Sequence, residues 1–412
     1  MRSAARGSGT AALVAVGASA VLAVGLVTQE QRREVALAAP AKGPRGASVF
    51  AWGGNAFGQL GTGSTGDKFT PKLVGEDLKL TAEHVAAFGQ SSGFVTAEAQ
   101  VYTFGRSTHG SIGQGDNMEN INLPAKVDIG PVAQISLGEF HVAFINTAGA
   151  LFTAGRNWSG ELGRQGDNTR PEKVALDRPV VDVACGRTFT AVVDADGDLF
   201  TTGNGKQGCL GHGSVTSLDT FTKVDPSLFG GEKVKQVAAG EEVLLILTEN
   251  GAVYSCGNDD YGKLGLGNLR ERLQTTPRQI TSLKGERIAQ VVCGDFFCAA
   301  LSENGTLFTW GMGSEGQLGH NSKTDLHIPT QVHAGSTSFK RIAAGGSHML
   351  AISTTGELFA WGKGRNGQLG VGDNFESVAI YHTNPTPVEF FKGKDVLDIA
   401  AGRDHSICLV GA

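Results

Sequence analysis

One phrase of glycines at fixed offsets occurs seven times in this 412-residue chain. The first copy runs from Val49 to Gly61, and in every copy a leading glycine is followed by glycines five and eight residues later. The leading glycines, which lie 48 to 54 residues apart, are Gly53, Gly105, Gly155, Gly203, Gly257, Gly311 and Gly362. A regular period of this size indicates one structural unit that is used seven times.

Each unit also carries the signal of a β-hairpin. A second series of glycines precedes two short apolar runs, and a turn separates the runs. These second-series glycines are Gly89, Gly138, Gly186, Gly240, Gly294, Gly345 and Gly402. The turns at Asp196–Gly197, Asn250–Gly251 and Asn304–Gly305 are typical of hairpins, because both residue types tolerate positive φ. The first unit has 97–100 at this place, without a glycine, so we expect a different and shorter turn there.

The variable part of most units adds further strands. A proline commonly precedes an apolar residue by three, as Pro71 precedes Val74, and proline belongs at the start or edge of a strand. Each unit then contains about four strands, and the chain is predicted to be an all-β, seven-bladed β-propeller. The chain enters the repeat at 49–52 and ends just before the equivalent strand would recur. We therefore expect the N-terminal strand to complete the C-terminal blade and close the ring.

These motifs resemble those of a known family. The phrase 358–370, combined with 344–348, closely resembles the repeat of the regulator of chromosome condensation family, and the resemblance extends from Val49 to the C-terminus. It implies a seven-bladed propeller. The family's founding member is a chromatin-bound nucleotide-exchange factor for the Ran GTPase, other members are interaction domains, and some mitochondrial relatives resemble assembly factors for respiratory complexes or ribosomes.

The N-terminal region differs from the repeats. Arg2 and Arg6 precede an apolar run over 11–27, and no acidic residue occurs before Glu30. This composition favours a mitochondrial presequence or membrane-anchor helix over residues 1–28, and a secretory signal remains an alternative. Residues 29–47 are interpreted as a linker and 48–412 as the propeller. The predicted location is mitochondrial, at the inner membrane, with the secretory pathway as the alternative.

The charge and the cysteines of the chain argue against several functions. The formal net charge is -5, and because the first 48 residues hold six Lys/Arg and two Glu (+4), the remainder carries -9. An acidic body argues against nucleic-acid binding through phosphates. The six cysteines have no paired spacing, so they are interpreted as small buried apolar residues. No catalytic, cofactor-binding or metal-binding residues are predicted, and His141, His348 and His405, which share a repeat position, are assigned to packing and local hydrogen bonding.

Two groups of residues are candidates for binding a protein partner. Charged residues follow the second-series glycines, and the symmetry of a propeller would bring these turns together on one face. They include Glu139, Arg187, Glu241, Asp295, Arg403 and Asp404. Aromatic residues of the glycine-bounded loops form the second group, because such residues are enriched at binding hot spots. They are Phe57, Trp158 and Tyr261.

Three functions are compatible with these features. The favoured hypothesis is a non-enzymatic scaffold that assists assembly of a mitochondrial respiratory complex or ribosome. The second is a guanine-nucleotide exchange factor for a small or dynamin-like GTPase, and the third is a secreted or lumenal propeller. The expected partners are proteins, with the membrane contacted through the N-terminal apolar segment.

Overall fold

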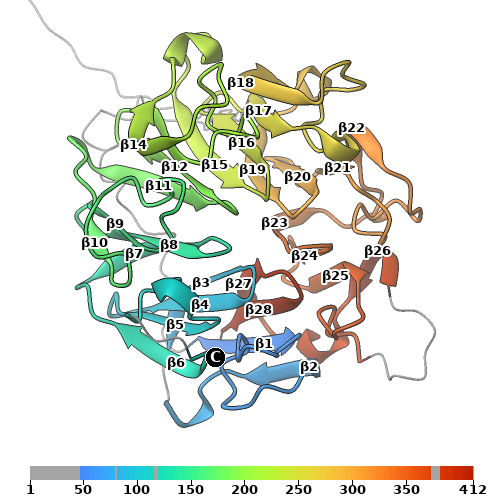
Figure 1. Cartoon of the computed structure of the whole chain (residues 1–412). Helices are drawn as coiled ribbons and strands as arrows, with labels where there is room; N and C mark the ends of the chain where they lie inside the picture. Colours follow the sequence, from blue (N-terminus) through green and yellow to red (C-terminus); the bar gives the residue numbers. More distant parts are fainter. Residues whose placement is uncertain (1–46, 79–80, 116–118, 373–380, 412) are drawn as a thin grey trace, which may run out of the picture.

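Seven antiparallel four-stranded sheets stand around a common centre in the computed structural model of the chain (Figure 1). The structure describes residues 47–78, 81–115, 119–372 and 381–411. Among these residues there are strands and short 3-10 turns and no α-helix. The predicted seven-bladed, all-β propeller is confirmed.

Six blades are built from consecutive strands, and in each of them the chain runs from the innermost strand to the outermost. Blade 1 has β3 (Ala82–Phe88), β4 (Ser91–Thr96), β5 (Val101–Gly105) and β6 (Ile121–Val127). Blade 2 has β7 (Val132–Leu137), β8 (His141–Asn146), β9 (Leu151–Gly155) and β10 (Glu172–Lys173). Blade 3 has β11 (Val180–Cys185), β12 (Phe189–Asp194), β13 (Leu199–Gly203) and β14 (Leu218–Lys223).

The remaining blades follow the same plan. Blade 4 has β15 (Val234–Ala239), β16 (Val243–Thr248), β17 (Val253–Asn258) and β18 (Leu273–Gln279). Blade 5 has β19 (Ile288–Cys293), β20 (Phe297–Ser302), β21 (Leu307–Gly311) and β22 (Leu326–Gln331). Blade 6 has β23 (Phe339–Ala344), β24 (His348–Ser353), β25 (Leu358–Lys363) and β26 (Tyr381–Pro387). The 3-10 turns are η1 (Glu76–Leu78), η2 (Thr108–Gly110), η3 (Pro226–Phe229), η4 (Asp260–Gly262), η5 (Thr281–Leu283) and η6 (Glu389–Phe391).

Blade 7 joins the two ends of the propeller. Its inner strands β27 (Val396–Ala401) and β28 (His405–Val410) come from the end of the chain, and its outer strands β1 (Ser48–Gly53) and β2 (Lys68–Leu73) come from the start. Strand β1 pairs with β28 from Ser48 opposite Val410 to Gly53 opposite His405. The predicted closure by the N-terminal strand is confirmed.

The repeated glycines let adjacent blades approach closely. Gly370 has φ +66°, and a Cβ there would lie 2.6 Å from Nε1 of Trp52 in blade 7. Gly367 has φ +82°, and its Cβ would lie 2.8 Å from the Cα of Phe69 in the outer strand of that blade. Both conformations and both distances favour glycine. Trp52 is fully buried, and its indole nitrogen donates to the carbonyl of Gln368 (2.9 Å).

The innermost strand of every blade contains a register shift, and a polar residue follows it. These residues are His84, Gln134, Asp182, Gln236, Gln290, Arg341 and Asp398. Inner strands of neighbouring blades do not pair as sheets. Their polar side chains cross the gap instead, as Gln290 accepts from the N–H of Ile342 (3.0 Å) and donates to its carbonyl (2.9 Å).

The three repeated histidines are fully buried and bond across blade boundaries. The Nε2 atoms of His141, His348 and His405 lie 2.9, 2.9 and 2.7 Å from the hydroxyl oxygens of Thr190, Ser406 and Ser92. Burial lowers their pKa values to about 3, about 4 and about 3. Their assignment to packing and hydrogen bonding agrees with these contacts. The six cysteines are also buried and free.

The hairpin turn of the first unit is not shorter, so that expectation is wrong. The N–H of Thr96 donates to the carbonyl of Gln100 (2.8 Å), as Asn146 donates to Ala150 (3.0 Å) in the next blade. Ala99 adopts φ 59° in place of the usual glycine. The first unit is instead one residue shorter in its β3–β4 loop. Ser91, which pairs with Gly105, lies two residues after Gly89, whereas His141, which pairs with Gly155, lies three residues after Gly138.

No helix among the described residues has the length and apolar character needed to cross a membrane. The predicted presequence or anchor over residues 1–28 lies outside the described residues, as does nearly all of the predicted linker over 29–47.

Ring closure through Trp52 yields a stability prediction. Replacement of this buried side chain by alanine (Trp52→Ala) is expected to lower the free energy of unfolding by about 3–5 kcal/mol, because it leaves a cavity at the blade 6–blade 7 boundary. Trp158→Ala is the matched control, since Trp158 is 76% exposed, and it should lower the free energy of unfolding by no more than about 1 kcal/mol. Urea unfolding followed by circular dichroism would measure both, and equal losses would contradict the proposed importance of the closure.

Candidate protein-binding face

One face of the ring carries both predicted groups of residues. Adjacent strands in each blade are antiparallel, so the loops after the first and third strands lie on the same side. We call this side the loop face. It holds the turns after the second-series glycines and the glycine-bounded loops, whereas the hairpin turns after the second strands lie on the opposite side.

A partly buried ion cluster lies at the centre of the loop face. Arg403, between β27 and β28, contacts carboxylates from three other blades: Glu139 (3.6 Å), Glu241 (2.6 Å) and Asp295 (3.2 Å). Arg187 contacts Glu241 at 3.5 Å. These five residues form what we call the Arg403 cluster. The sequence-based expectation that these turns converge agrees with the contacts.

Burial dominates the electrostatics of the Arg403 cluster. It raises the pKa of Asp295 to about 6, and Glu241 and Glu139 add to the rise while Arg403 opposes it. Burial also opposes ionisation of Arg403, but the carboxylates of Asp295, Glu139 and Glu241 outweigh this effect and raise its pKa. The charges of the Arg403 cluster are paired with one another, and these ion pairs connect five blades.

Asp404 does not join the Arg403 cluster. Its carboxylate contacts Lys363 Nζ (2.7 Å), and its backbone carbonyl accepts from the N–H of Gly54 (2.7 Å). The residue therefore connects β25 of blade 6 with the β27–β28 and β1–β2 loops of blade 7.

A row of alternating rings and guanidinium groups crosses the loop face. The Arg106 guanidinium lies 5.5 Å from the ring centre of Phe57 and 5.2 Å from that of Phe140. The Arg156 guanidinium lies 4.1 Å from Phe140 and 5.1 Å from Trp158. We call these five residues the aromatic–arginine ladder. Each stacked pair contributes about 0.5–1 kcal/mol at an exposed site, so the ladder holds side chains of three blades in a fixed arrangement.

Trp158 ends the ladder and is 76% exposed. Its only ring neighbour among the described residues is His109, whose ring centre lies 5.5 Å away in an edge arrangement. An indole so exposed leaves apolar area available for a partner.

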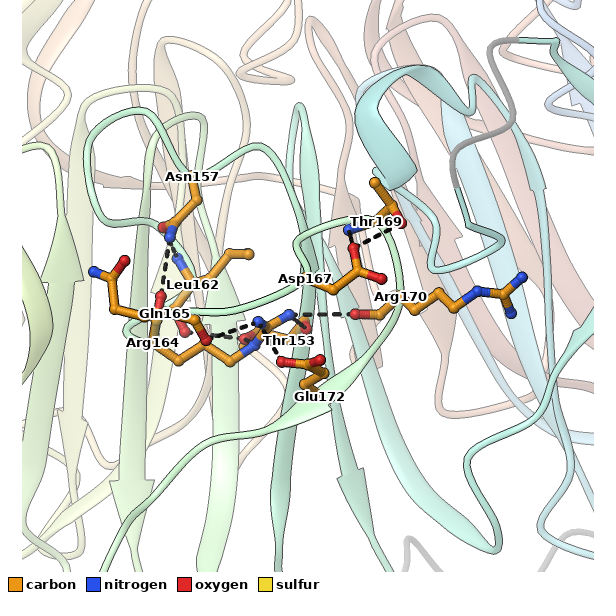
Figure 2. Close-up of polar contacts among 9 residues, drawn as sticks. All are labelled: Thr153, Asn157, Leu162, Arg164, Gln165, Asp167, Thr169, Arg170 and Glu172. Atoms are coloured by element: carbon orange, nitrogen blue, oxygen red, sulfur yellow. Dashed lines mark hydrogen bonds and ion pairs between the residues drawn. The ribbon is translucent and has the colours of Figure 1, made fainter.

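Hydrogen bonds and an ion pair of Arg164 and Asn157 fix the loop that carries Trp158 (Figure 2). Arg164, which is buried, donates to the carbonyl of Thr153 (2.6 Å) and to that of Arg170 (3.2 Å), and it pairs with Glu172 (3.1 Å). Asn157, next to Trp158, donates to the Arg164 carbonyl (3.0 Å) and accepts from the N–H of Leu162 (3.0 Å). Trp158 is therefore displayed on an ordered loop, which lowers the entropy lost on binding.

Tyr261 lies apart from the ladder. It is 45% exposed in the β17–β18 loop, and its ring packs against Phe296 at 5.6 Å. The buried Lys263 ammonium lies 5.3 Å from the same Phe296 ring. The structure thus joins Phe57 with Trp158 and leaves the third predicted aromatic residue in a separate cluster.

Sequence reasoning missed the three ladder residues that connect Phe57 with Trp158. Arg106 and Arg156 directly follow the leading glycines of two consecutive copies, and Phe140 lies two residues after a second-series glycine. Arginines at the same position of two consecutive copies could have been recognised from the sequence as candidate site residues. The position of Phe140 between them depends on the packing of blades 1 and 2, and no spacing in the chain gives it.

Metal coordination finds no support among the described residues, because no three His, Cys, Asp or Glu side chains there are grouped to hold an ion.

The propeller and its glycine-bounded loops define a class of ring-shaped proteins built from this repeat. The model of the RCC1-like domain matches residues 119–412, and the model of the regulator of chromosome condensation (RCC1) repeat matches 47–95. The chain belongs to the RCC1-like family.

Several curated relatives cover most of the chain. The ultraviolet-B receptor UVR8 of Arabidopsis thaliana is 31% identical over 88% of this chain and 70% of its own length. The mitochondrial RCC1 domain-containing protein RUG3 of the same plant is 29% identical over 88% of this chain and 72% of its own. The mouse E3 ubiquitin-protein ligase HERC2 is 32% identical, but only 8% of its length is covered.

Solved structures share the fold. Human WBSCR16 superposes with a TM-score of 0.79 at 24% identity and covers 89% of this chain and 100% of its own. Prp20p of Saccharomyces cerevisiae, described with its binding properties to Gsp1p and histones, superposes with a TM-score of 0.79 at 20% identity and covers 92% and 94%. At these identities the likeness establishes the fold alone.

The raised pKa of Asp295 predicts a pH-dependent stability. Its folded-state pKa of about 6 lies above the ordinary 3.8, so its contribution is fully present below pH 3.8 and is lost as pH rises towards 6. Relative to Asp295→Asn, the wild type should lose stability across this window and then level off. Urea unfolding of both proteins at several pH values would measure the difference, and a difference that stays flat or rises with pH would contradict the prediction.

Proposed function

We propose that this chain is a non-enzymatic protein-interaction scaffold of mitochondria and that it binds its partner through the aromatic–arginine ladder. The observation that carries the proposal is the exposed indole of Trp158 on a loop fixed by Arg164. Large aromatic side chains on rigid supports are typical anchors of protein interfaces. The charges of the Arg403 cluster, by contrast, are already paired with one another.

Two features support the mitochondrial location. The N-terminal residues are rich in Arg, Ser and Ala and contain no acid before Glu30. RUG3, a relative over most of the chain, is a mitochondrial protein by its name. Attachment to the inner membrane through residues 1–28 and a part in assembling a respiratory complex or ribosome complete the proposal. Carbonate extraction of isolated mitochondria would test the attachment.

Trp158→Ala should remove the partner and leave the fold intact. The test is affinity purification of the tagged full chain from isolated mitochondria, with mass spectrometry of the co-purifying proteins. A partner bound through the ladder should fall by about tenfold or more with Trp158→Ala, because hot-spot aromatic residues contribute about 2 kcal/mol or more. Tyr261→Ala, at another exposed aromatic residue of the loop face, is the matched control and should retain the partner.

Other outcomes would redirect the assignment. Co-purifying proteins that remain unchanged with Trp158→Ala would remove the ladder from the proposal. Accelerated nucleotide release from a co-purifying GTPase would favour an exchange factor. Recovery of the chain from the secretory pathway would contradict the mitochondrial location.

A further inference from the structure

The charges around the ladder indicate the chemistry of the partner. Arg156 pairs with the buried Glu161 (3.1 Å), and Arg187 pairs with Glu241 (3.5 Å). Arg106 has no carboxylate partner in the described part of the chain, and its guanidinium donates only to the side-chain carbonyl of Gln90 (3.1 Å). The ladder therefore contains one cation without a counterion, between two rings and within reach of the loop face.

We propose that the ladder binds an acidic protein segment that carries an apolar or aromatic side chain beside its carboxylates, a proposal that rests on the proposed function. A carboxylate of the segment would pair with Arg106, whose planar guanidinium suits a bidentate contact. The neighbouring apolar side chain would cover the exposed indole of Trp158. The ordered loop holds the Trp158 indole, and the neighbouring rings hold the Arg106 guanidinium, before a partner binds.

The surroundings favour a protein segment over a polyphosphate. Nucleic acids and anionic membranes are held by many uncompensated cations, whereas the ladder offers one. The body of the protein is acidic overall, and three carboxylates of the Arg403 cluster lie on the same face. A partner with one or two carboxylates and an apolar anchor meets less repulsion from these negative charges than a polyphosphate does.

The experiment uses the full chain and labelled synthetic peptides. One peptide has glutamates on both sides of a single phenylalanine, a second replaces the glutamates by lysines, and a third replaces the phenylalanine by serine. Fluorescence anisotropy would measure binding at low and at raised salt. We expect the first peptide to bind most tightly and to weaken as salt rises, because exposed ion pairs are screened.

Variants locate the binding. Trp158→Ala and Arg106→Gln should each weaken the first peptide by about tenfold. Arg106→Lys should weaken it less, because lysine keeps the charge and loses the planar contact. Tyr261→Ala and Arg272→Gln, which change an exposed aromatic residue and an exposed arginine outside the ladder, are the controls and should bind as the wild type does. Circular dichroism would show that every variant is folded.

Three results would overturn the inference. They are equal binding of the glutamate and lysine peptides, equal weakening by the ladder variants and the controls, or ladder-dependent binding of a single-stranded oligonucleotide or of phosphatidylglycerol vesicles without binding of the glutamate peptide. If Trp158→Ala still releases a mitochondrial partner in any of these cases, the proposed function stands and only the chemistry assigned to the partner is wrong. If no partner depends on Trp158 but the glutamate peptide binds as expected, the proposed function is wrong and the chemistry of the surface stands.

Discussion

Neighbouring blades share no sheet hydrogen bonds, so the closed ring depends on the contacts that bridge the space between adjacent sheets. Hydrophobic clusters fill most of the space between the sheets, but the innermost strands also carry backbone groups that need partners. The register shift in each inner strand is followed by a polar side chain, and several of these residues bond to the backbone of the next blade. The buried histidines add bonds to hydroxyl groups at three further points.

The loop face holds two sets of charged residues in different surroundings. At the centre, Arg403 is surrounded by carboxylates and joins blades that are far apart in the sequence. Further out, Arg106 and Arg156 are stacked between rings, which keeps their charges near the surface. Both sets follow glycines of the repeat, but at two different positions: the Arg403 cluster follows glycines of the second series, whereas Arg106 and Arg156 follow leading glycines. The charge content of the turns alone therefore did not predict the aromatic–arginine ladder.

The repeat made the architecture predictable. Fixed offsets from Gly53 to Gly370 specify the blade number, and the half-unit at each end specifies closure by β1. Other features depend on three-dimensional context. Ala99 takes a conformation usually left to glycine, which no turn rule anticipates. The ladder arises because Phe140 of blade 2 lies between Arg156 of the same blade and Arg106 of blade 1. Tyr261 is excluded because its own neighbour is Phe296. Residue type and position in the repeat made Trp158 and Phe57 candidates, but only the three-dimensional packing shows that one ladder connects them.

The shared blade also has a consequence for biogenesis. Strand β1 is made first and its partner β28 last, with nearly the whole propeller between them. Until β28 emerges from a ribosome or a translocation pore, the β1–β2 hairpin has an open edge. A hairpin alone is marginally stable in water, so this stretch must wait in an unfinished state. The ring can therefore close only after β28 has been made, and its dependence on chaperones should be greatest immediately before that step.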